Sequence, residues 1–185
     1  MLHEPMQATS ILFSLKVNNL VKYTCFCVLN LDQILYKDIF RVTFMGIRNA
    51  KVKDKFAVTE IAENSIPFVR PSVAGTYEYL ARCFQRTFFI YEENSKPMGF
   101  IVGFPNTSAE GEFWLYQIAI REEYREKGIG SKLFEAFIAQ VKNDGYIKIR
   151  SHYKFENERS AKAHAKFGFE RCGKDDRGWF VELIL

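Results

Sequence analysis

Two glycines flanked by basic side chains form the first pattern that could do chemistry. The run Arg125-Glu126-Lys127-Gly128-Ile129-Gly130 stands between an apolar stretch and an amphipathic one that predicts a helix. Because glycine has no Cβ, a ligand can approach the backbone closely at both positions. The free N–H groups of the helix's first turn favour an anion, to which Arg125 and Lys127 would add positive charge. Taken alone, however, a glycine pair more often marks only a tight helix start beside a solvated basic face.

Two well-known phosphate loops do not fit these residues. A Walker A loop requires Gly-Lys-Ser/Thr at its end, whereas Gly130 is followed by Ser131 and Lys132. A dinucleotide fingerprint requires a third glycine where this chain has Leu133, and it normally opens the fold rather than lying past its midpoint. The turn is therefore neither a nucleotide P-loop nor a Rossmann loop.

The elements that must position this turn can be read from apolar periodicity and turn residues. Strands are expected at 42–48, 86–91, 98–104, 112–120, 146–153, 169–172 and 179–185, and helices at 51–64, 72–85, 129–142 and 158–167. An antiparallel hairpin, with its turn at 93–97, precedes a strand-helix-strand unit, which requires a mixed sheet. The predicted fold class is an α/β sandwich.

Composition limits the other possibilities. A chain of 185 residues with 48% hydrophobic residues suits one domain with a substantial core. The net charge of +4, from 26 basic and 22 acidic residues, is too mild and too interspersed for a dedicated nucleic-acid binder. No membrane span or signal peptide is expected, because the apolar stretch 11–31 is broken by polar residues. Four cysteines without paired spacing favour the cytoplasm: Cys25, Cys27, Cys83 and Cys172.

Residues 1–41 differ from the rest, because they show no regular apolar period and contain no glycine. One hypothesis is an appended strand-helix element that packs on the core. The other is that this segment is not native protein and that translation starts at Met45. An endogenous peptide from upstream of Met45, detected by mass spectrometry, would exclude the second hypothesis.

The pattern Arg/Gln-x-x-Gly-x-Gly/Ala at 125–130, with its flanking strand and helix, resembles the GNAT (GCN5-related N-acetyltransferase) superfamily. Two further segments are similar to that family: Ile47-Arg48-x-Ala50-x-x-x-Asp54 and Asn157-x-x-Ser160-x-x-x-His164-x-x-x-Gly168-Phe169. The resemblance covers Val42 to Leu185, the expected domain 42–185. It implies a mixed, mostly antiparallel central sheet flanked by helices and splayed near its middle strands.

The resemblance implies acetyl-CoA as the acyl donor. Backbone N–H groups of the turn would hold the pyrophosphate, and the strand at 118–120 would pair with the pantetheine arm and polarise the thioester carbonyl. Asn157 matches an asparagine that contacts the pantetheine arm, although its ordinary interpretation is a helix N-cap. The implied donor-binding residues are Ile118, Ala119, Ile120, Arg125, Glu126, Lys127, Gly128, Ile129, Gly130, Ser131, Asn157 and Ser160.

The catalytic residues are less certain from the sequence. His164 stands where the family usually has a tyrosine that protonates the departing thiolate, and some branches that acylate small molecules also have histidine there. Glu112 and Tyr116 lie on the strand that leads to the thioester position, and alternation along the strand predicts that their side chains face the same way as that position. They are therefore candidates for the general base. A rim carboxylate and a packed aromatic are equally reasonable interpretations of them. His152 is a third candidate, and no metal site is predicted.

The acceptor site is expected from the loop between the first two helices and the last strands, at 66–79 and 175–179. There Glu78, Asp175 and Asp176 could attract an amine, and Phe68, Tyr77 and Trp179 could line a pocket. The predicted function is direct transfer of an acetyl group to a primary amine of a small molecule. The resemblance also admits a homodimer, and the charge and apolar patterns described above predict neither nucleic acid nor membrane as a partner. The alternative is a non-catalytic acyl-CoA-binding sensor of the same fold.

Overall fold

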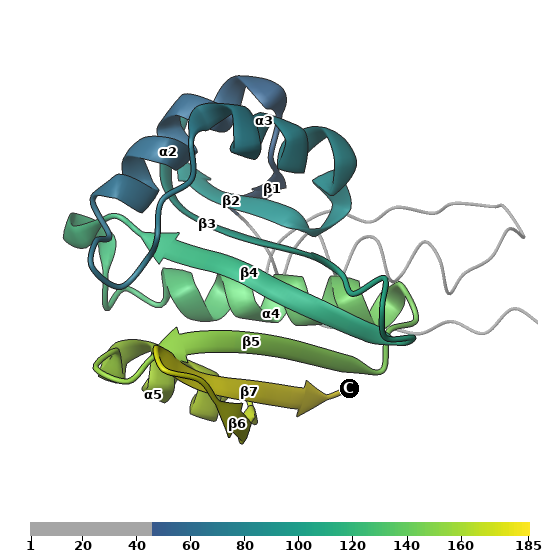
Figure 1. Cartoon of the computed structure of the whole chain (residues 1–185). Helices are drawn as coiled ribbons and strands as arrows, with labels where there is room; N and C mark the ends of the chain where they lie inside the picture. The colour runs from purple at the N-terminus through teal and green to yellow at the C-terminus, as the bar shows by residue number, and fades with distance from the viewer. Residues whose placement is uncertain (1–45) are drawn as a thin grey trace, which may run out of the picture.

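The computed structural model describes residues 46–185, which form one mixed sheet with helices on both faces (Figure 1). The predicted N-terminal element, the alternative start at Met45 and the first residues of the strand expected at 42–48 lie outside the described residues. The sheet order is β1-β2-β3-β4-β5-β7-β6. The strands are β1 (Ile47–Asn49), β2 (Phe88–Glu93), β3 (Lys96–Pro105), β4 (Glu112–Ile120), β5 (Lys148–Lys154), β6 (Glu170–Lys174) and β7 (Gly178–Ile184).

The helices follow the predicted order. The α-helices are α2 (Lys55–Glu63), α3 (Ala74–Cys83), α4 (Ile129–Asn143) and α5 (Glu158–Lys166). Short 3-10 turns are η1 (Val52–Asp54), η2 (Gln85–Thr87) and η3 (Glu122–Tyr124). The predicted fold class is confirmed, and the predicted boundaries differ from these by a few residues.

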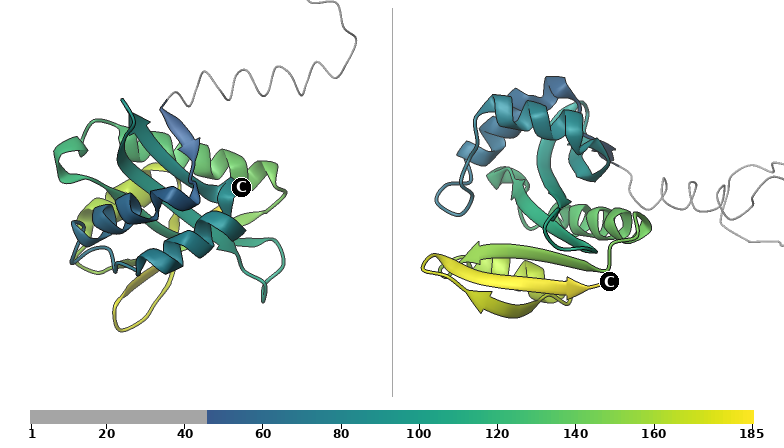
Figure 2. Two further views of the ribbon diagram at one scale, coloured as in Figure 1. Left: turned by 90° about the horizontal axis from the view of Figure 1, so that it is seen from above. Right: turned by 45° about the vertical axis from the view of Figure 1, so that its right-hand side comes forward.

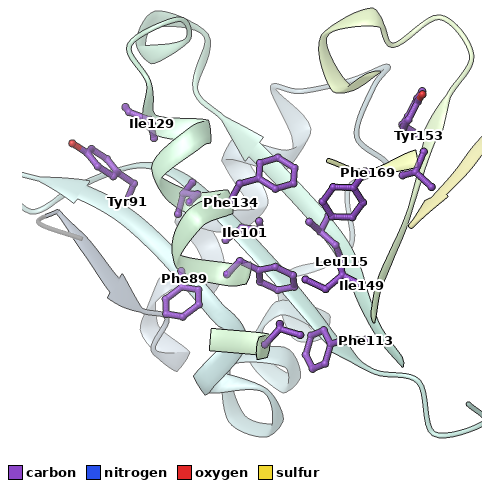
Figure 3. Packing of buried hydrophobic residues seen from close by; sticks show 14 of the residues in the cluster. Phe89, Tyr91, Ile101, Phe113, Leu115, Ile129, Phe134, Ile149, Tyr153 and Phe169 are labelled. Atoms are coloured by element: carbon purple, nitrogen blue, oxygen red, sulfur yellow. The ribbon is translucent and has the colours of Figure 1, made fainter. Parts of the chain in front are cut away.

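Alternating side chains of the strands divide the core into two clusters. On β2, Phe89 and Tyr91 pack under α4 with the apolar residues of α5, whereas Phe88 and Ile90 pack under α2 and α3. The two helix pairs therefore cover opposite faces of the sheet (Figure 2). Figure 3 shows the first cluster, in which Phe134 of α4 lies among the strand side chains.

A β-bulge interrupts β4 at Tyr116. Val102 of β3 pairs with Gln117, but the next residue, Gly103, pairs with Leu115, so Tyr116 has no partner in the ladder. A Cβ at Gly103 would lie 2.2 Å from the carbonyl oxygen of Trp114, so only glycine allows this approach. The extra residue changes which face the following side chains occupy.

The sheet opens between β4 and β5. These parallel strands pair only at Glu112 with Lys148, Phe113 with Ile149, and Trp114 with Arg150. Beyond these pairs the strands diverge toward their carboxyl ends, and α4 lies behind the gap (Figure 1). The remaining neighbours in the sheet are antiparallel. The splay near the middle strands lies where the family resemblance implies it.

No helix among residues 46–185 is long and apolar enough to cross a membrane. The same residues contain no group of three or more His, Cys, Asp or Glu side chains placed to hold a metal ion.

Candidate active site

A pocket of about 330 Å³ lies at the carboxyl end of β4, on the face covered by α4 and α5. Its walls come from the end of β4, the turn before α4, the first turn of α4 and one face of α5. Ser65, Phe68 and Val69 of the α2–α3 loop close one side. The pocket therefore joins three segments that the sequence placed in one donor site, 118–120, 125–131 and 157–160.

The first turn of α4 opens into this pocket without a cap. Gly128 is the N-cap residue, and no side chain accepts a hydrogen bond from the start of the helix. The first intrahelical donor is the N–H of Lys132, which bonds the carbonyl of Gly128. A Cβ at Gly128 or Gly130 would meet nothing within 4 Å, so the space before the helix is open. Uncapped N–H groups at the positive end of a helix dipole suit a diphosphate.

The backbone of the turn requires unusual conformations. Gly128 has φ +78°, which glycine adopts freely, and Glu126 has φ +63°, which is costly for a residue with a Cβ. Both line the pocket. Costly backbone conformations of this kind concentrate at binding sites, where the surrounding structure holds them in place.

The two basic residues of the turn have different roles. Arg125 lines the pocket, but its Nε donates to the carbonyl of Ile120 at 3.1 Å, which ties the turn to the end of β4. Lys127 is not among the lining residues, and its Nζ lies 5.1 Å from the ring centroid of Tyr124. Ile129 also contributes only backbone, because its side chain is buried in the core.

The strand segment 118–120 forms the floor of the pocket. Ile118 and Ile120 pack against the α4 cluster, and Ala119 packs in the α2–α3 cluster. Their backbone pairs with β3 on one side only, because β5 has already diverged. This strand edge is available to an extended ligand, as an added strand would use it.

Asn157 and Ser160 lie together at the start of α5. The side chain of Asn157 accepts a hydrogen bond of 3.0 Å from the N–H of Ser160, so it is an N-cap, and both residues line the pocket. The two interpretations of Asn157 are therefore compatible, because capping uses its oxygen and leaves its amide nitrogen for a ligand.

His164 does not line the donor pocket and is only 2% exposed. Its Nδ1 lies 2.8 Å from the carbonyl oxygen of Ser160, and its Nε2 lies 3.0 Å from Oγ of Ser151. Burial lowers the pKa of His164 to about 4, partly offset by the Ser160 hydrogen bond, so the ring is neutral near pH 7. The structure therefore does not support His164 as the acid expected at this position, because the ring is buried and both its nitrogens have hydrogen-bond partners.

Glu112 lies at the closed end of β4 and is 3% exposed. Its carboxylate accepts from Nδ2 of Asn106 at 2.7 Å and pairs with Nζ of Lys148 at 3.0 Å. Burial alone would raise the pKa of Glu112, but these hydrogen bonds and the charge of Arg150 more than offset it and hold the pKa below its ordinary value.

The expected parity of Glu112 with the thioester position is also wrong. Before the bulge, Phe113 and Leu115 face the α4 cluster; after it, Ile118 and Ile120 do. Glu112 therefore shares its face with Ala119 instead. Its ion pairs and its position six residues before the pocket argue against a role as the base.

Tyr116 is the bulged residue and is 39% exposed. Its hydroxyl lies 3.0 Å from Oγ of Ser72, and its ring centroid lies 5.4 Å from that of Phe104. It is on the side of the sheet opposite the donor pocket, beside the α2–α3 loop. The bulge, which the sequence did not predict, is the reason that it does not share the orientation of Ile118.

The residues expected at the acceptor site lie in four different places. Phe68 lines the donor pocket, whereas Tyr77 is fully buried and donates to Gln117. Glu78 pairs with Lys55 and Arg82 on the outer side of α3. The β6–β7 turn carries Asp175 and Asp176; the Trp179 ring at its end lies 4.2 Å from the guanidinium of Arg171.

Several residues of the pocket were not predicted. Lys166 and Arg159 of α5 line it, and Nζ of Lys166 donates to Oγ of Ser131 at 2.7 Å across its mouth. Ala163 and Phe167 complete the same helix face. Helical spacing from Asn157 and Ser160 was a signal that could have found these residues.

Comparison with known proteins agrees with this geometry. The model of the Acetyltransferase (GNAT) family matches residues 56–169, more than half of the chain. An L-2,4-diaminobutyric acid acetyltransferase from Streptomyces anulatus is 28% identical over 107 residues, which are 56% of this chain and 59% of that protein. The match thus spans less than two thirds of that relative's length.

Solved structures show the same fold. The Ard1 structure from Thermoplasma volcanium has a TM-score of 0.68 at 23% identity, covering 75% of this chain and 96% of that one. An N-acetyltransferase from Staphylococcus aureus Mu50 has a TM-score of 0.63 at 27% identity, with the same coverage. The predicted family is confirmed, and the name of that family describes acetyltransferases. The chain belongs to the Acetyltransferase (GNAT) family.

Proposed function

We propose that the protein transfers an acetyl group from acetyl-CoA directly to a primary amine of a small molecule. The observation that carries the proposal is the uncapped start of α4, which faces the pocket between Gly128 and Ser131. An anion with several oxygens satisfies such N–H groups where one side-chain cap could not. The edge of β4 at 118–120 leads from this anion site toward the gap in the sheet.

The assigned donor-binding residues act mainly through the backbone. N–H groups at 128–131 hold the pyrophosphate, and the edge of β4 pairs with the pantetheine arm. Asn157 and Ser160 add side-chain donors from α5, and Lys166 adds charge at the mouth. Acetyl-CoA supplies the activated thioester. No cysteine lines the pocket within the described residues, which favours direct transfer over a covalent acyl-enzyme.

The relative from Streptomyces anulatus supplies a first acceptor to test, because its name states L-2,4-diaminobutyric acid. The test measures thiol release from acetyl-CoA with this amine, other amino acids, polyamines and amino sugars. Mass spectrometry of the product then locates the added acetyl group. Release that requires the amine supports the proposal. Tight acetyl-CoA binding without amine-dependent release favours the non-catalytic sensor.

The sensor is kept as the second candidate because of His164. The position of the family's tyrosine carries a neutral core side chain, so the described residues supply no tyrosine at that point of α5. An active enzyme must then return a proton to the leaving thiolate from another donor, such as the pocket-lining hydroxyl of Ser160 or a water.

A further inference from the structure

A second group of polar side chains lies on the side of the sheet opposite the donor pocket. Along β5, Ile149 and Tyr153 pack in the α4 cluster, so the intervening side chains of Arg150 and His152 face the other way. No helix of the described residues covers β5 and β7 on that face (Figure 1). The ring of His152 lies 4.8 Å from that of Phe180, its cross-strand neighbour on β7.

His152 forms a pair with Asp175 of the β6–β7 turn. Nε2 of His152 lies 3.0 Å from Oδ1 of Asp175, and both side chains are about one quarter exposed, at 24% and 22%. The same oxygen accepts from the N–H groups of Arg177 and Gly178, at 2.9 Å each. The β6–β7 turn therefore holds the carboxylate in place independently of the imidazole.

This pairing determines which imidazole nitrogen is free. A carboxylate accepts only, so Nε2 carries the proton and donates it to Asp175, and Nδ1 keeps its lone pair. Within residues 46–185, Nδ1 has no hydrogen-bond partner. The N–H of Arg177 largely holds the pKa of Asp175 below its ordinary value, with His152 and Gly178 adding to this. The aspartate is thus an anion at every working pH.

The position of His152 follows from the ladder between β4 and β5. The last pair is Trp114 with Arg150, so two residues further along each strand are Tyr116 and His152. They are the first side chains beyond the last ladder pair on the face opposite the donor pocket. The donor edge of β4 begins at Ile118, two residues beyond Tyr116. His152 therefore lies beside the gap, on the face of the sheet opposite the pocket.

We infer that His152, oriented by Asp175, is the general base that accepts the proton of the acceptor amine through Nδ1. This inference rests on the proposed function. The ammonium gives one proton to Nδ1 and becomes a neutral amine. The amine nitrogen forms a bond to the thioester carbonyl carbon, the carbon–sulfur bond breaks, and CoA leaves as a thiolate. The amide loses its extra N–H proton, and the thiolate takes up a proton, so one proton is released overall.

The other candidates for the base are already engaged. Glu112 is buried and paired with Lys148, and the hydroxyl of Tyr116 is hydrogen-bonded to Ser72. The charged groups around His152 are Asp175 and Arg177 from the β6–β7 turn, with Arg150 and Lys154 on β5 itself. Arg150 is directed to Glu112 and the Trp114 ring, and Lys154 donates to the carbonyl of Pro67. Of these four charged groups, Asp175 contacts the imidazole.

The test compares His152→Gln with wild type in thiol release from acetyl-CoA, using L-2,4-diaminobutyrate and the amine panel as acceptors. General-base catalysis contributes typically ~100-fold or more, so kcat should fall about 100-fold while the KM for acetyl-CoA stays within about twofold.

Two variants of the turn separate the base from its surroundings. Asp175→Asn keeps an oxygen for the N–H groups of Arg177 and Gly178 but loses the charge that orients His152, so kcat should fall about tenfold while the KM for acetyl-CoA stays within about twofold. Arg177→Gln removes an exposed positive charge that pairs with the same carboxylate, and kcat should stay at the wild-type value. A wild-type kcat in His152→Gln would overturn this inference alone. Absence of amine-dependent release by the wild-type protein would overturn the proposed function, and this inference with it.

Discussion

The two ends of β4 use the same kind of backbone in opposite ways. At the closed end, residues 112–114 have a neighbour on both sides, and the buried carboxylate of Glu112 is matched by Lys148, Asn106 and Arg150. At the open end, residues 118–120 have β3 on one side and a pocket in place of β5. One end stabilises the sheet, and the other leaves backbone groups for a ligand.

The difference shows that a charged residue on this strand is not evidence of catalysis. Glu112 is the charged residue of β4, yet all its oxygens are used at the closed end. The open end contributes almost no charge and presents N–H groups and glycines to the pocket. The following variants test this division, beginning with the largest expected effect.

Gly130→Asp should weaken acetyl-CoA binding at least 100-fold, measured as Kd by calorimetry. The carboxylate would occupy the open space at the helix start and repel the pyrophosphate. Folding should not suffer, because an acid in the first turn favours the helix by about 0.3–1 kcal/mol. The matched control is Gly75→Asp, which places the same charge in the first turn of α3, also in open space. Equal Kd values for both variants would contradict the pocket assignment.

His164→Gln should alter how stability depends on pH. The folded pKa of about 4 lies below the ordinary 6.5, so between these values the unfolded chain binds more protons. The wild-type protein should therefore lose about 2–3 kcal/mol of unfolding free energy as pH falls from about 6.5 to 4. The His164→Gln variant should lose about 2–3 kcal/mol less unfolding free energy than wild type over the same pH range, measured by urea denaturation. Identical pH dependence in both proteins would show that His164 is not a buried neutral ring.

Glu112→Gln should destabilise the fold by about 2 kcal/mol, because it leaves Lys148 and Arg150 without their buried anion. Its kcat should stay within about threefold of wild type. Since the folded pKa of Glu112 is lowered, the stability it contributes is present above pH 4.5 and is lost as pH falls further.

A matched control for that variant is Glu182→Gln, which removes a more exposed partner of the same lysine. Its effect should stay below about 0.5 kcal/mol. A large loss of kcat in Glu112→Gln, with stability intact, would show that Glu112 is the base. The closed end of β4 would then contribute to catalysis as well as to the sheet.

Lys127→Gln should have the smallest effect, less than about twofold in the Kd for acetyl-CoA. Its ammonium lies over the Tyr124 ring rather than in the pocket, and because Lys127 is exposed, salt weakens its effect on a bound anion. A tenfold loss would show that side-chain charge, and not backbone, dominates the turn.

Much of the pocket at the end of β4 could be predicted from the sequence, because its walls depend on backbone and glycine. The order of strands and helices followed from apolar periodicity, and the turn at 125–130 carried its own pattern. Local sequence patterns of this kind predict the folded structure, since a glycine pair before an amphipathic helix has few other conformations available.

The side-chain assignments failed where they depended on long-range geometry. The bulge at Tyr116 is set by Gly103 on another strand, so counting parity along β4 placed Glu112 on the wrong face. The burial of His164 depends on Phe134, Phe169 and Tyr153 from three other elements. The contact between His152 and Asp175 joins residues that no short pattern connects.

A structure of the protein with acetyl-CoA tests the central claim most directly. The account predicts the pyrophosphate on the N–H groups at 128–131 and the thioester beside Ile118, with open access from the face of Tyr116 and His152. A pyrophosphate bound away from the start of α4, or a thioester that cannot be reached through the gap between β4 and β5, would contradict it.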